Sequence, residues 1–193
     1  MNKKIIKERI RKLLLEKKGD THDYGCVMLD LKITKGQWDK FQSLILDDDI
    51  YEVEGDRSYG REDEPHITLL YGLHKTISDD EIKEISINFE IIEVLLKKIS
   101  IFESEEYDVV KFDIIDDSKK VLTEINSEYA KLPHTTSFLN YLPHATLAYV
   151  KKGTGKNYIK TLSDDDVIKV NCDTIRYSKI DGSEIKYKLS KNK

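Results

Sequence analysis

Four stretches of the chain place apolar residues at the helical period. The first spans 2–18, and the second begins after Thr34, which can cap it, and runs to Leu46. The third follows Ser78, because a serine with a glutamate three residues later is a capping-box pattern. The fourth spans 117–131. We expect this last helix to bury the face made of Val121, Ile125 and Tyr129.

Other stretches alternate apolar and polar residues, or are rich in β-branched residues, as strands do. Residues 24–33 predict one buried strand. Residues 88–115 predict two or three antiparallel strands, including a hairpin, with a polar break around 103–107. Two closing strands are predicted at 167–178 and 184–189. Helices and strands mix without a regular strand–helix–strand alternation. The pattern therefore predicts an α+β fold with antiparallel sheets.

One strand-like segment occurs twice. PHITLLYG occupies 65–72 and PHATLAYV occupies 143–150, and five of the eight positions are identical. The chain has only 3 prolines and 5 histidines, yet two of each fall in these segments. An internal repeat of this kind predicts two structurally related halves.

The repeat has a polar and an apolar face if each copy is a strand, since successive side chains point to opposite sides. In the first copy we expect His66 and Thr68 on one face, together with Leu70. The opposite face would be made of Ile67, Leu69 and Tyr71. In the second copy the same alternation sets His144, Thr146 and Ala148 against Ala145, Leu147 and Tyr149. Each strand thus offers one imidazole and one hydroxyl side by side.

Charge and composition limit the classes of partner. The formal net charge is −4, from 32 Lys and Arg against 36 Asp and Glu, and no basic stripe is visible. This balance favours a small ligand over a long nucleic acid. No apolar run approaches the roughly 20 residues of a membrane span, and charges interrupt the N-terminal apolar positions, unlike in a secretory signal. We therefore expect a cytoplasmic protein without a membrane partner, in which Cys26 and Cys172 are buried free thiols.

Two imidazoles facing one point are suited to phosphoryl chemistry. A neutral histidine can take a proton from an attacking hydroxyl, and a protonated one can give a proton to the departing oxygen. Both forms exist near neutral pH because the reference pKa of histidine is about 6.5. The two threonine hydroxyls can donate hydrogen bonds to the non-bridging phosphate oxygens. None of these steps requires a metal or a cofactor.

Other interpretations of the histidines are weaker. One histidine followed by a threonine on a strand is usually structural. Zinc is poorly matched by two histidines without a cysteine or carboxylate partner, and a serine nucleophile would need its glycine-flanked elbow. The repetition with matching flanks favours a site. Outside the repeat, the chain has His22, His74 and His134, which we expect to be structural or exposed.

The two His-X-Thr segments resemble those of the 2H phosphoesterase superfamily. This resemblance implies one bilobal α+β domain with a pseudo-two-fold axis, in which two antiparallel sheets flank a central cleft and helices lie outside. It covers about 24–189 of the 193-residue chain and leaves the N-terminal helix, within 1–20, outside. It also implies catalytic roles for His66, Thr68, His144 and Thr146.

The segments YGCVMLDL and GREDEPHITLLYGL are further similar to the phage anti-CBASS nucleases, which cleave the cyclic di- and trinucleotides that bacteria use as infection alarms. The likeness implies a 3′,5′-linked cyclic oligonucleotide as substrate and, for a viral enzyme, the host cytoplasm as its location. Tyr24 is then a candidate for stacking a base, with core packing as its alternative. Arg61 is a candidate for meeting phosphate, with a solvated surface position as its alternative.

The residues thus predict a metal-independent phosphodiesterase of a small ligand, and the resemblance implies that this ligand is a cyclic oligonucleotide. Two alternatives stay open. One is the hydrolysis of 2′,3′-cyclic phosphates at RNA ends or on small nucleotides. The other is a protein that only sequesters a nucleotide, although pure binding does not require an acid–base pair.

Overall fold

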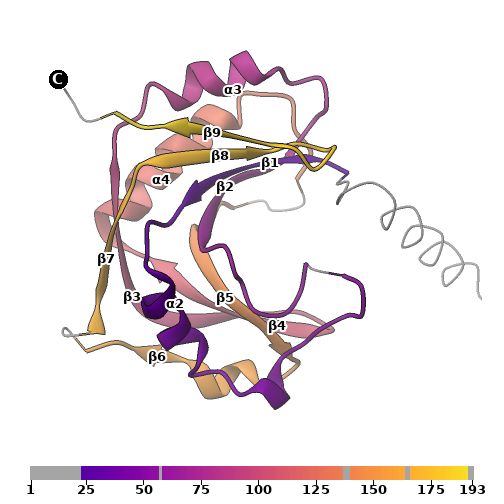
Figure 1. Cartoon of the computed structure of the whole chain (residues 1–193), viewed down its shortest axis with the longest axis vertical. Coiled ribbons are helices and arrows are strands. Elements are labelled where there is room, and N and C mark those ends of the chain that lie inside the picture. The colour runs from indigo at the N-terminus through magenta and orange to yellow at the C-terminus, as the bar shows by residue number, and fades with distance from the viewer. Residues whose placement is uncertain (1–22, 57, 137–139, 164–165, 191–193) are drawn as a thin grey trace, which may run out of the picture.

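Two antiparallel sheets form the frame of the molecule (Figure 1). A computed structural model describes residues 23–56, 58–136, 140–163 and 166–190. The first sheet has the order β2-β1-β8-β9, with β1 at Gly25–Asp30, β2 at His66–Leu73, β8 at Thr174–Ser178 and β9 at Glu184–Lys188. The second has the order β5-β4-β3, and both β6 and β7 pair with β3. Its strands are β3 at Ile92–Glu103, β4 at Tyr107–Ile114, β5 at His144–Lys151, β6 at Lys160–Thr161 and β7 at Ile168–Cys172. The predicted α+β class is confirmed.

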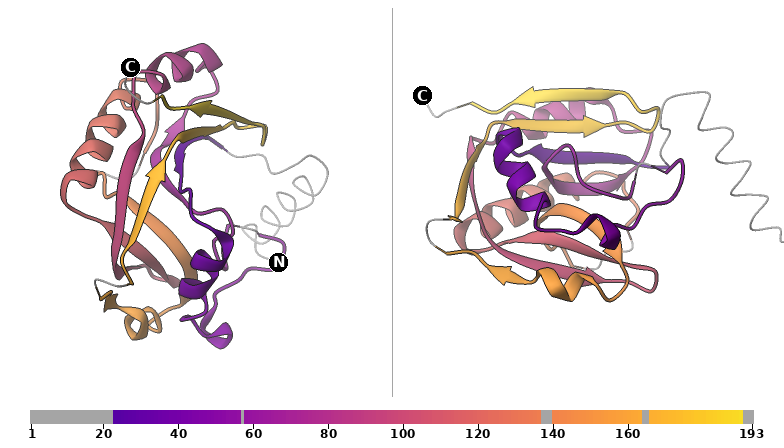
Figure 2. Two further views of the ribbon diagram at one scale, coloured as in Figure 1. Left: turned by 60° about the vertical axis from the view of Figure 1, so that its left-hand side comes forward. Right: turned by 60° about the horizontal axis from the view of Figure 1, so that its bottom comes forward.

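Three α-helices accompany the sheets in the described part of the chain. They are α2 at Lys35–Gln42, α3 at Asp79–Ser86 and α4 at Asp116–Tyr129, with short 3-10 turns η1 at Asp47–Asp49 and η2 at Gly155–Tyr158. Thr34 caps α2 and Ser78 caps α3, each through a capping box. The sequence predicted the capping box at Ser78 and a helix cap at Thr34. Figure 2 shows from two further sides that α4 lies on the outer side of the frame. The helix predicted at 2–18 lies outside the described residues.

The helix after Thr34 ends at Gln42, four residues before the predicted end at Leu46. The carbonyl oxygens of Gln42 and Ile45 accept hydrogen bonds from the guanidinium of Arg61, at 2.5 and 2.8 Å. These carbonyls are therefore satisfied without a further helical turn. The long-range contact, which a local pattern does not contain, decides where this helix ends.

The buried face of α4 is rotated from the predicted one. Leu122, Ile125 and Tyr129 are at most 1% exposed, whereas Val121 is 39% exposed. The prediction for Val121 was wrong because the spacing 122, 125, 129 fits the helical period equally well. The packing of α4 against β2 and β3 selects that face.

The predicted strand at 167–178 is two strands in two different sheets. β7 pairs with β3 in the second sheet, and β8 pairs with β1 in the first. The change occurs at Asp173, whose carboxylate accepts hydrogen bonds from the Thr174 hydroxyl at 2.8 Å and from Lys188 at 3.1 Å. This one segment therefore ties the sheets together. Alternation along a chain shows that a stretch is extended but does not show which sheet it joins.

Candidate active site

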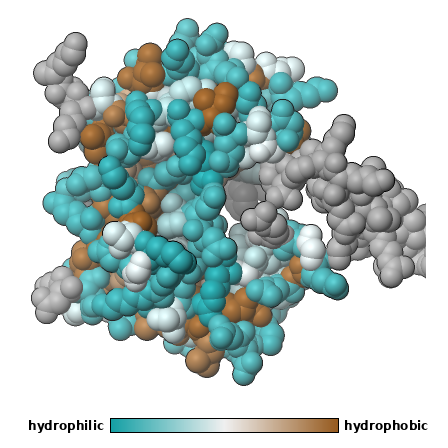
Figure 3. Space-filling view, viewed as in Figure 1, coloured by the Kyte–Doolittle hydropathy of each residue, from teal (hydrophilic) through white to brown (hydrophobic). Residues whose placement is uncertain are grey.

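The two repeated segments are β2 and β5, the edge strands of the two sheets. Each begins at its histidine, and residues of the two strands contact one another. In Figure 1 the strands start side by side and then diverge, β2 upward and β5 downward. The charge of His66 is also among the causes that lower the pKa of His144. The space-filling view shows a hollow between the upper and lower parts of the molecule (Figure 3).

Both histidines are held by the same hydrogen bond. Nδ1 of His66 lies 2.7 Å from the carbonyl oxygen of Glu64, and Nδ1 of His144 lies 2.8 Å from that of Leu142. A carbonyl oxygen only accepts, so Nδ1 is the protonated nitrogen in each ring. Nε2 is then the atom that gains or loses a proton. In both rings, Nε2 is therefore the nitrogen that can accept or donate a proton in acid–base catalysis.

Each histidine strand has a β-bulge one residue after its threonine. Thr68 pairs with Met28 and Leu70 with Val27, which leaves Leu69 out of the register. The second strand repeats this geometry, because Thr146 pairs with Lys111 and Ala148 with Val110, which leaves Leu147 out. A bulge places two residues opposite one and re-aims the side chains beyond it.

A helix amide supports each bulge. Nδ2 of Asn126 in α4 donates to the carbonyl oxygen of Leu69 at 2.6 Å. Nε2 of Gln42 in α2 donates to the carbonyl oxygen of Leu147 at 3.2 Å. The two halves therefore correspond in strand, bulge and supporting helix, which fits the pseudo-two-fold relation.

The bulges correct the predicted faces of the repeat. Tyr71 pairs with Cys26, which is two residues from Met28, the partner of Thr68. Tyr149 pairs with Val109, which is likewise two residues from the partner of Thr146. Residues two apart on a strand point to the same face. Both tyrosines therefore lie on the histidine face, the sheet face that carries the His and Thr side chains, and not on the opposite face as predicted. Leu70 and Ala148, predicted beside the histidines, are instead buried in the core.

The histidine face of the second sheet holds a buried lysine. Lys111 is 4% exposed and lies in register with Thr146, while Asp113 lies in register with His144. Nζ of Lys111 is 2.5 Å from Asp113 Oδ1 and 2.8 Å from the Ser100 hydroxyl. It also lies 4.0 Å from the centre of the Phe102 ring, whose edge-to-face contact with His144 has a centroid distance of 4.9 Å.

These neighbours set the proton affinity of the site. Burial lowers the pKa of His144, the Leu142 carbonyl and Asp113 act in the opposite direction, and the charges of Lys111 and His66 lower it further. Burial alone would raise the pKa of Asp113, but hydrogen bonds from Lys111 and Ser100 outweigh it and the pKa is lowered. His144 is thus biased toward its neutral form, beside the ion pair of Lys111 and Asp113.

The first sheet surrounds its histidine differently. Asp30 lies in register with His66, and Nε of Arg176 donates to Asp30 Oδ1 at 2.9 Å. Arg176 is 4% exposed and also binds the carboxylates of Glu64 and Glu184. A further carboxylate oxygen, Oε2 of Glu62, is 3.9 Å from Nδ1 of His66. Acidic groups thus dominate the surroundings of His66.

The comparisons with known proteins agree with this architecture. No family model matches the chain, and no curated protein matches its sequence. Among solved structures, Usb1 of Kluyveromyces marxianus has a TM-score of 0.56 at 11% identity, covering 86% of this chain and 98% of Usb1. E. coli LigT with 3′-AMP has a TM-score of 0.51 at 12% identity, covering 87% of this chain and 97% of LigT. The chain has the fold of the 2H phosphoesterases.

Within this fold, the structure places His66 and Thr68 on the histidine face of β2 and His144 and Thr146 on that of β5, and the two strands contact one another. It does not bring Tyr24 to the histidines. Tyr24 precedes Gly25, which pairs with Leu73, at the opposite end of β2 from His66. Its ring contacts Tyr71 edge to face, with centroids 6.1 Å apart.

Arg61 has a structural position. Its guanidinium binds the carbonyl oxygens of Gln42 and Ile45 and, at 2.6 Å, the carboxylate of Asp47. Its hydrogen-bonding groups are therefore used to hold the segment after α2. This geometry argues against the predicted contact with phosphate, and we do not assign Arg61 to the site.

The polar residues on the strands beside the histidines were not predicted from the sequence. Lys111 and Asp113 stand two apart within VVKFDI, an otherwise apolar part of β4, and this spacing puts both on one face. Buried charges in such a strand are rare, so the pattern was a usable signal. Asp30 and Arg176 come from distant parts of the chain and had no comparable local signal.

The cysteines are free, as expected; Cys172 is buried as predicted, whereas Cys26 as a whole residue is only partly buried. Burial raises the pKa of Cys26 to about 12, with a hydrogen bond from Thr68 acting in the opposite direction. A thiol of this pKa is protonated at neutral pH and is not a nucleophile. Among the residues that the structure describes, no group of three or more His, Cys, Asp or Glu is arranged to hold a metal. Within the same residues, no helix is long and apolar enough to cross a bilayer.

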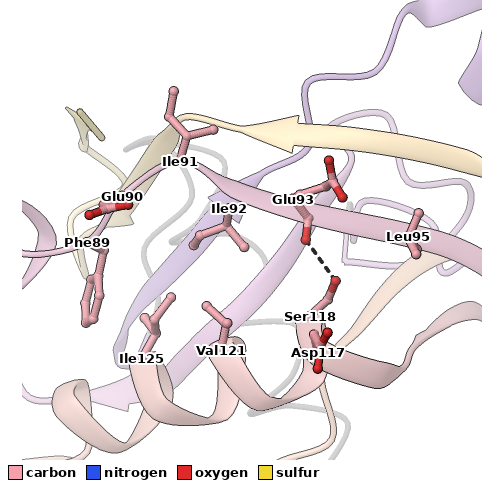
Figure 4. A pocket seen from close by; sticks show the side chains of 10 residues that line it. All are labelled: Phe89, Glu90, Ile91, Ile92, Glu93, Leu95, Asp117, Ser118, Val121 and Ile125. Atoms are coloured by element: carbon pink, nitrogen blue, oxygen red, sulfur yellow. Dashed lines mark hydrogen bonds between the residues drawn. The ribbon is translucent and has the colours of Figure 1, made fainter. Parts of the chain in front are cut away.

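A separate pocket of about 430 Å³ lies between the start of β3 and α4 (Figure 4). Its walls include Ile92, Val121 and Ile125, and the Ser118 hydroxyl donates to the carbonyl oxygen of Glu93 at 2.8 Å. Three acidic residues and no basic one are among the side chains that line it. The pocket is therefore unsuited to a phosphate and contains no residue of β2 or β5.

Proposed function

We propose that the protein is a phosphodiesterase in which His66 and His144 act as an acid–base pair on a small nucleotide. The observation that carries the proposal is the meeting of two equivalent histidine strands, each with Nδ1 bonded to a carbonyl and Nε2 left free. A site that only bound a nucleotide would not need two matched imidazoles. The shared fold with the phosphoesterases supports the same reaction class.

We assign the base role to His144 and the acid role to His66. The lowered pKa of His144 keeps its Nε2 unprotonated near neutral pH. Nε2 removes the proton of a ribose 2′-hydroxyl, and the 2′-oxygen forms a bond to the adjacent phosphorus. The bond from phosphorus to the 5′-oxygen breaks, and the leaving oxygen takes a proton from protonated His66. Oε2 of Glu62 lies 3.9 Å from Nδ1 of His66, on the side of the ring away from Nε2.

Thr68 and Thr146 stabilise the charge that develops on the phosphate. Each hydroxyl lies two residues from its histidine on the same strand face, so both donors approach the phosphate from opposite halves. The buried Lys111, in register with Thr146, adds positive charge on one side. Such preorganised donors contribute most when charge builds up in the transition state.

The substrate that we propose is a 3′,5′-linked cyclic di- or trinucleotide, which the reaction opens. The net charge of −4 and the similarity of YGCVMLDL and the loop before β2 to phage anti-CBASS nucleases support it. A 2′,3′-cyclic phosphate on RNA or a small nucleotide is the second candidate. It is favoured by the neighbours of the fold, because Usb1 has been solved with uridine monophosphate and LigT with 3′-AMP.

The test offers purified protein a panel of cyclic di- and trinucleotides and a 2′,3′-cyclic-phosphate RNA in the presence of EDTA. We expect cleavage of the cyclic oligonucleotides in excess over enzyme, lost in His66→Ala and in His144→Ala. Their 2′-deoxy analogues should resist cleavage, because the attacking hydroxyl is missing. Recovery of intact ligand in stoichiometric amount would instead identify a sequestering protein, and loss of activity with chelator would contradict the mechanism.

A further inference from the structure

Four tyrosines pack against one another near the end of β5. They are Tyr51, Tyr59, Tyr107 and Tyr149, and the five ring contacts among them have centroid distances of 5.2 to 5.4 Å. All four side chains are partly exposed, so the group is a surface and not a section of the core. We call these four residues the tyrosine group.

The bulge at Leu147 brings this group to the site. Tyr149 follows Thr146 by three residues, or about 10 Å along the strand, and lies on the same face. Tyr51 and Tyr59 belong to the loop before β2 and are joined to β5 by backbone hydrogen bonds. One runs from Tyr51 N to Tyr149 O at 3.0 Å, and another from Tyr149 N to Gly60 O at 2.8 Å. The aromatic rings are thus fixed to the strand that carries His144.

Glu62 connects the tyrosine group to the other histidine. Its carboxylate is 3.9 Å from Nδ1 of His66. The same carboxylate, after burial and the neighbouring Tyr107, contributes to raising the pKa of Tyr149. The backbone N of Glu62 also donates to the carbonyl oxygen of Leu147 at 3.0 Å. Glu62 therefore lies between β5, the strand of Tyr149, and His66.

The other half has a smaller counterpart. Tyr71 occupies the position in β2 that Tyr149 occupies in β5, is 43% exposed and lies beyond the equivalent bulge. It contacts Tyr24, whose ring lies 6.1 Å from that of His74. Because β2 and β5 diverge from their histidines (Figure 1), the two aromatic groups lie on opposite sides of the site.

We infer that the tyrosine group is a stacking platform for one nucleobase and that Tyr71 with Tyr24 is the platform for a second, with the joining phosphodiester between the histidines. This inference deepens the proposed function and rests on it. Aromatic side chains stack on any base, so the platforms select for two nucleotides joined by one phosphate and not for a particular sequence. The ligand class is a dinucleotide unit, and a mononucleotide would occupy one platform only.

The experiment measures binding apart from cleavage. A 2′-deoxy cyclic dinucleotide is titrated calorimetrically into His144→Ala protein and into the same protein carrying Tyr59→Ala or Tyr71→Ala. Loss of one stacking contact should raise Kd by about tenfold. Tyr59→Phe should retain the affinity because it keeps the ring. Tyr158→Phe, altered outside both platforms, serves as the matched control, and circular dichroism checks that each variant is folded.

The outcomes separate the inference from the function. If the deoxy dinucleotide binds and both alanine variants raise its Kd, the stacking platforms are supported, even if the wild-type protein cleaves no dinucleotide. If the wild-type protein cleaves dinucleotides and the alanine variants keep its KM, the platforms are wrong and the phosphodiesterase stands. With a 2′,3′-cyclic mononucleotide as the probe, one alanine variant should raise KM and the other should not. An equal effect of both would overturn the assignment of one base to each platform.

Discussion

The two halves of the molecule share a motif and differ in what surrounds it. In both, a histidine strand forms the sheet edge, Nδ1 binds the carbonyl two residues earlier and a bulge follows the threonine. Beside Thr146 lies the buried Lys111, whereas beside Thr68 lies the neutral Met28. Two copies of one motif can therefore take opposite roles in proton transfer. The neighbouring strands, not the motif, create the difference.

The largest expected effect separates the two histidines. His66→Ala and His144→Ala should each lower kcat/KM by about 10²- to 10⁴-fold on an ordinary dinucleotide. A ribonucleoside 3′-(4-nitrophenyl) phosphate has a leaving group that needs no proton. We expect it to restore cleavage in His66→Ala and not in His144→Ala, measured by nitrophenolate release. The reverse pattern would exchange the acid and base roles.

A second comparison concerns the last residue of each repeat, Gly72 in one half and Val150 in the other. Gly72 has a φ of 106°, and a Cβ there would lie 2.0 Å from the carbonyl oxygen of Thr135. Gly72→Ala should lower the free energy of unfolding by about 2 kcal/mol or more, measured by urea denaturation. Gly36→Ala is the control, because a Cβ there meets no atom within 4 Å. Equal stabilities of the two variants would show that β2 can relax at this point.

The amides that support the bulges provide a third test. Gln42→Leu should cost about 1–3 kcal/mol of unfolding free energy, because it removes both hydrogen bonds of a buried amide. The carbonyl oxygens of Glu62 and Leu147 keep their other donors, Trp38 Nε1 at 2.7 Å and the backbone N of Glu62 at 3.0 Å. Asn126→Leu should cost less, since Asn126 Nδ2 binds one carbonyl oxygen whereas Gln42 Nε2 binds those of Glu62 and Leu147. The exposed Asn88 is the control, and Asn88→Ala should change stability little. A larger loss in Asn126→Leu than in Gln42→Leu would contradict the expected order.

The smallest expected effect is a shift in pH dependence. Lys111 lowers the pKa of His144, while Asp113 raises it. Lys111→Met removes the cation and leaves the carboxylate, so the pKa of His144 should rise. The base is active when neutral, and the ascending limb of kcat/KM should therefore move to higher pH.

The control for this shift is Lys98→Met. Lys98 is half exposed, and its Nζ is 3.8 Å from the same Asp113 carboxylate. Its removal should move the limb much less, because solvent screens an exposed charge. A limb that stays in place in Lys111→Met, or moves to lower pH, would exclude His144 as the base.

Local patterns predicted the elements well where their cause is local. The capping box at Ser78 and the hairpin around 103–107 depend on residues close in sequence, and both are present. The end of α2 and the division of 167–178 at Asp173 depend on partners far along the chain, and both were missed. The same distinction applies to the candidate site. The pair His66 and His144 was visible as a repeat, whereas the structural position of Arg61 required its distant partners.

By itself, the sequence determined the α+β class and the two His-X-Thr strands, because periodicity and repetition are properties of the chain alone. Only the tertiary structure decided that the strands meet at their histidines, that bulges turn Tyr71 and Tyr149 to the histidine face, and that Lys111 lies beside Thr146. These features arise from pairing between distant strands. A bulge changes the face of every residue beyond it, and no local period records where the partner strand will require one.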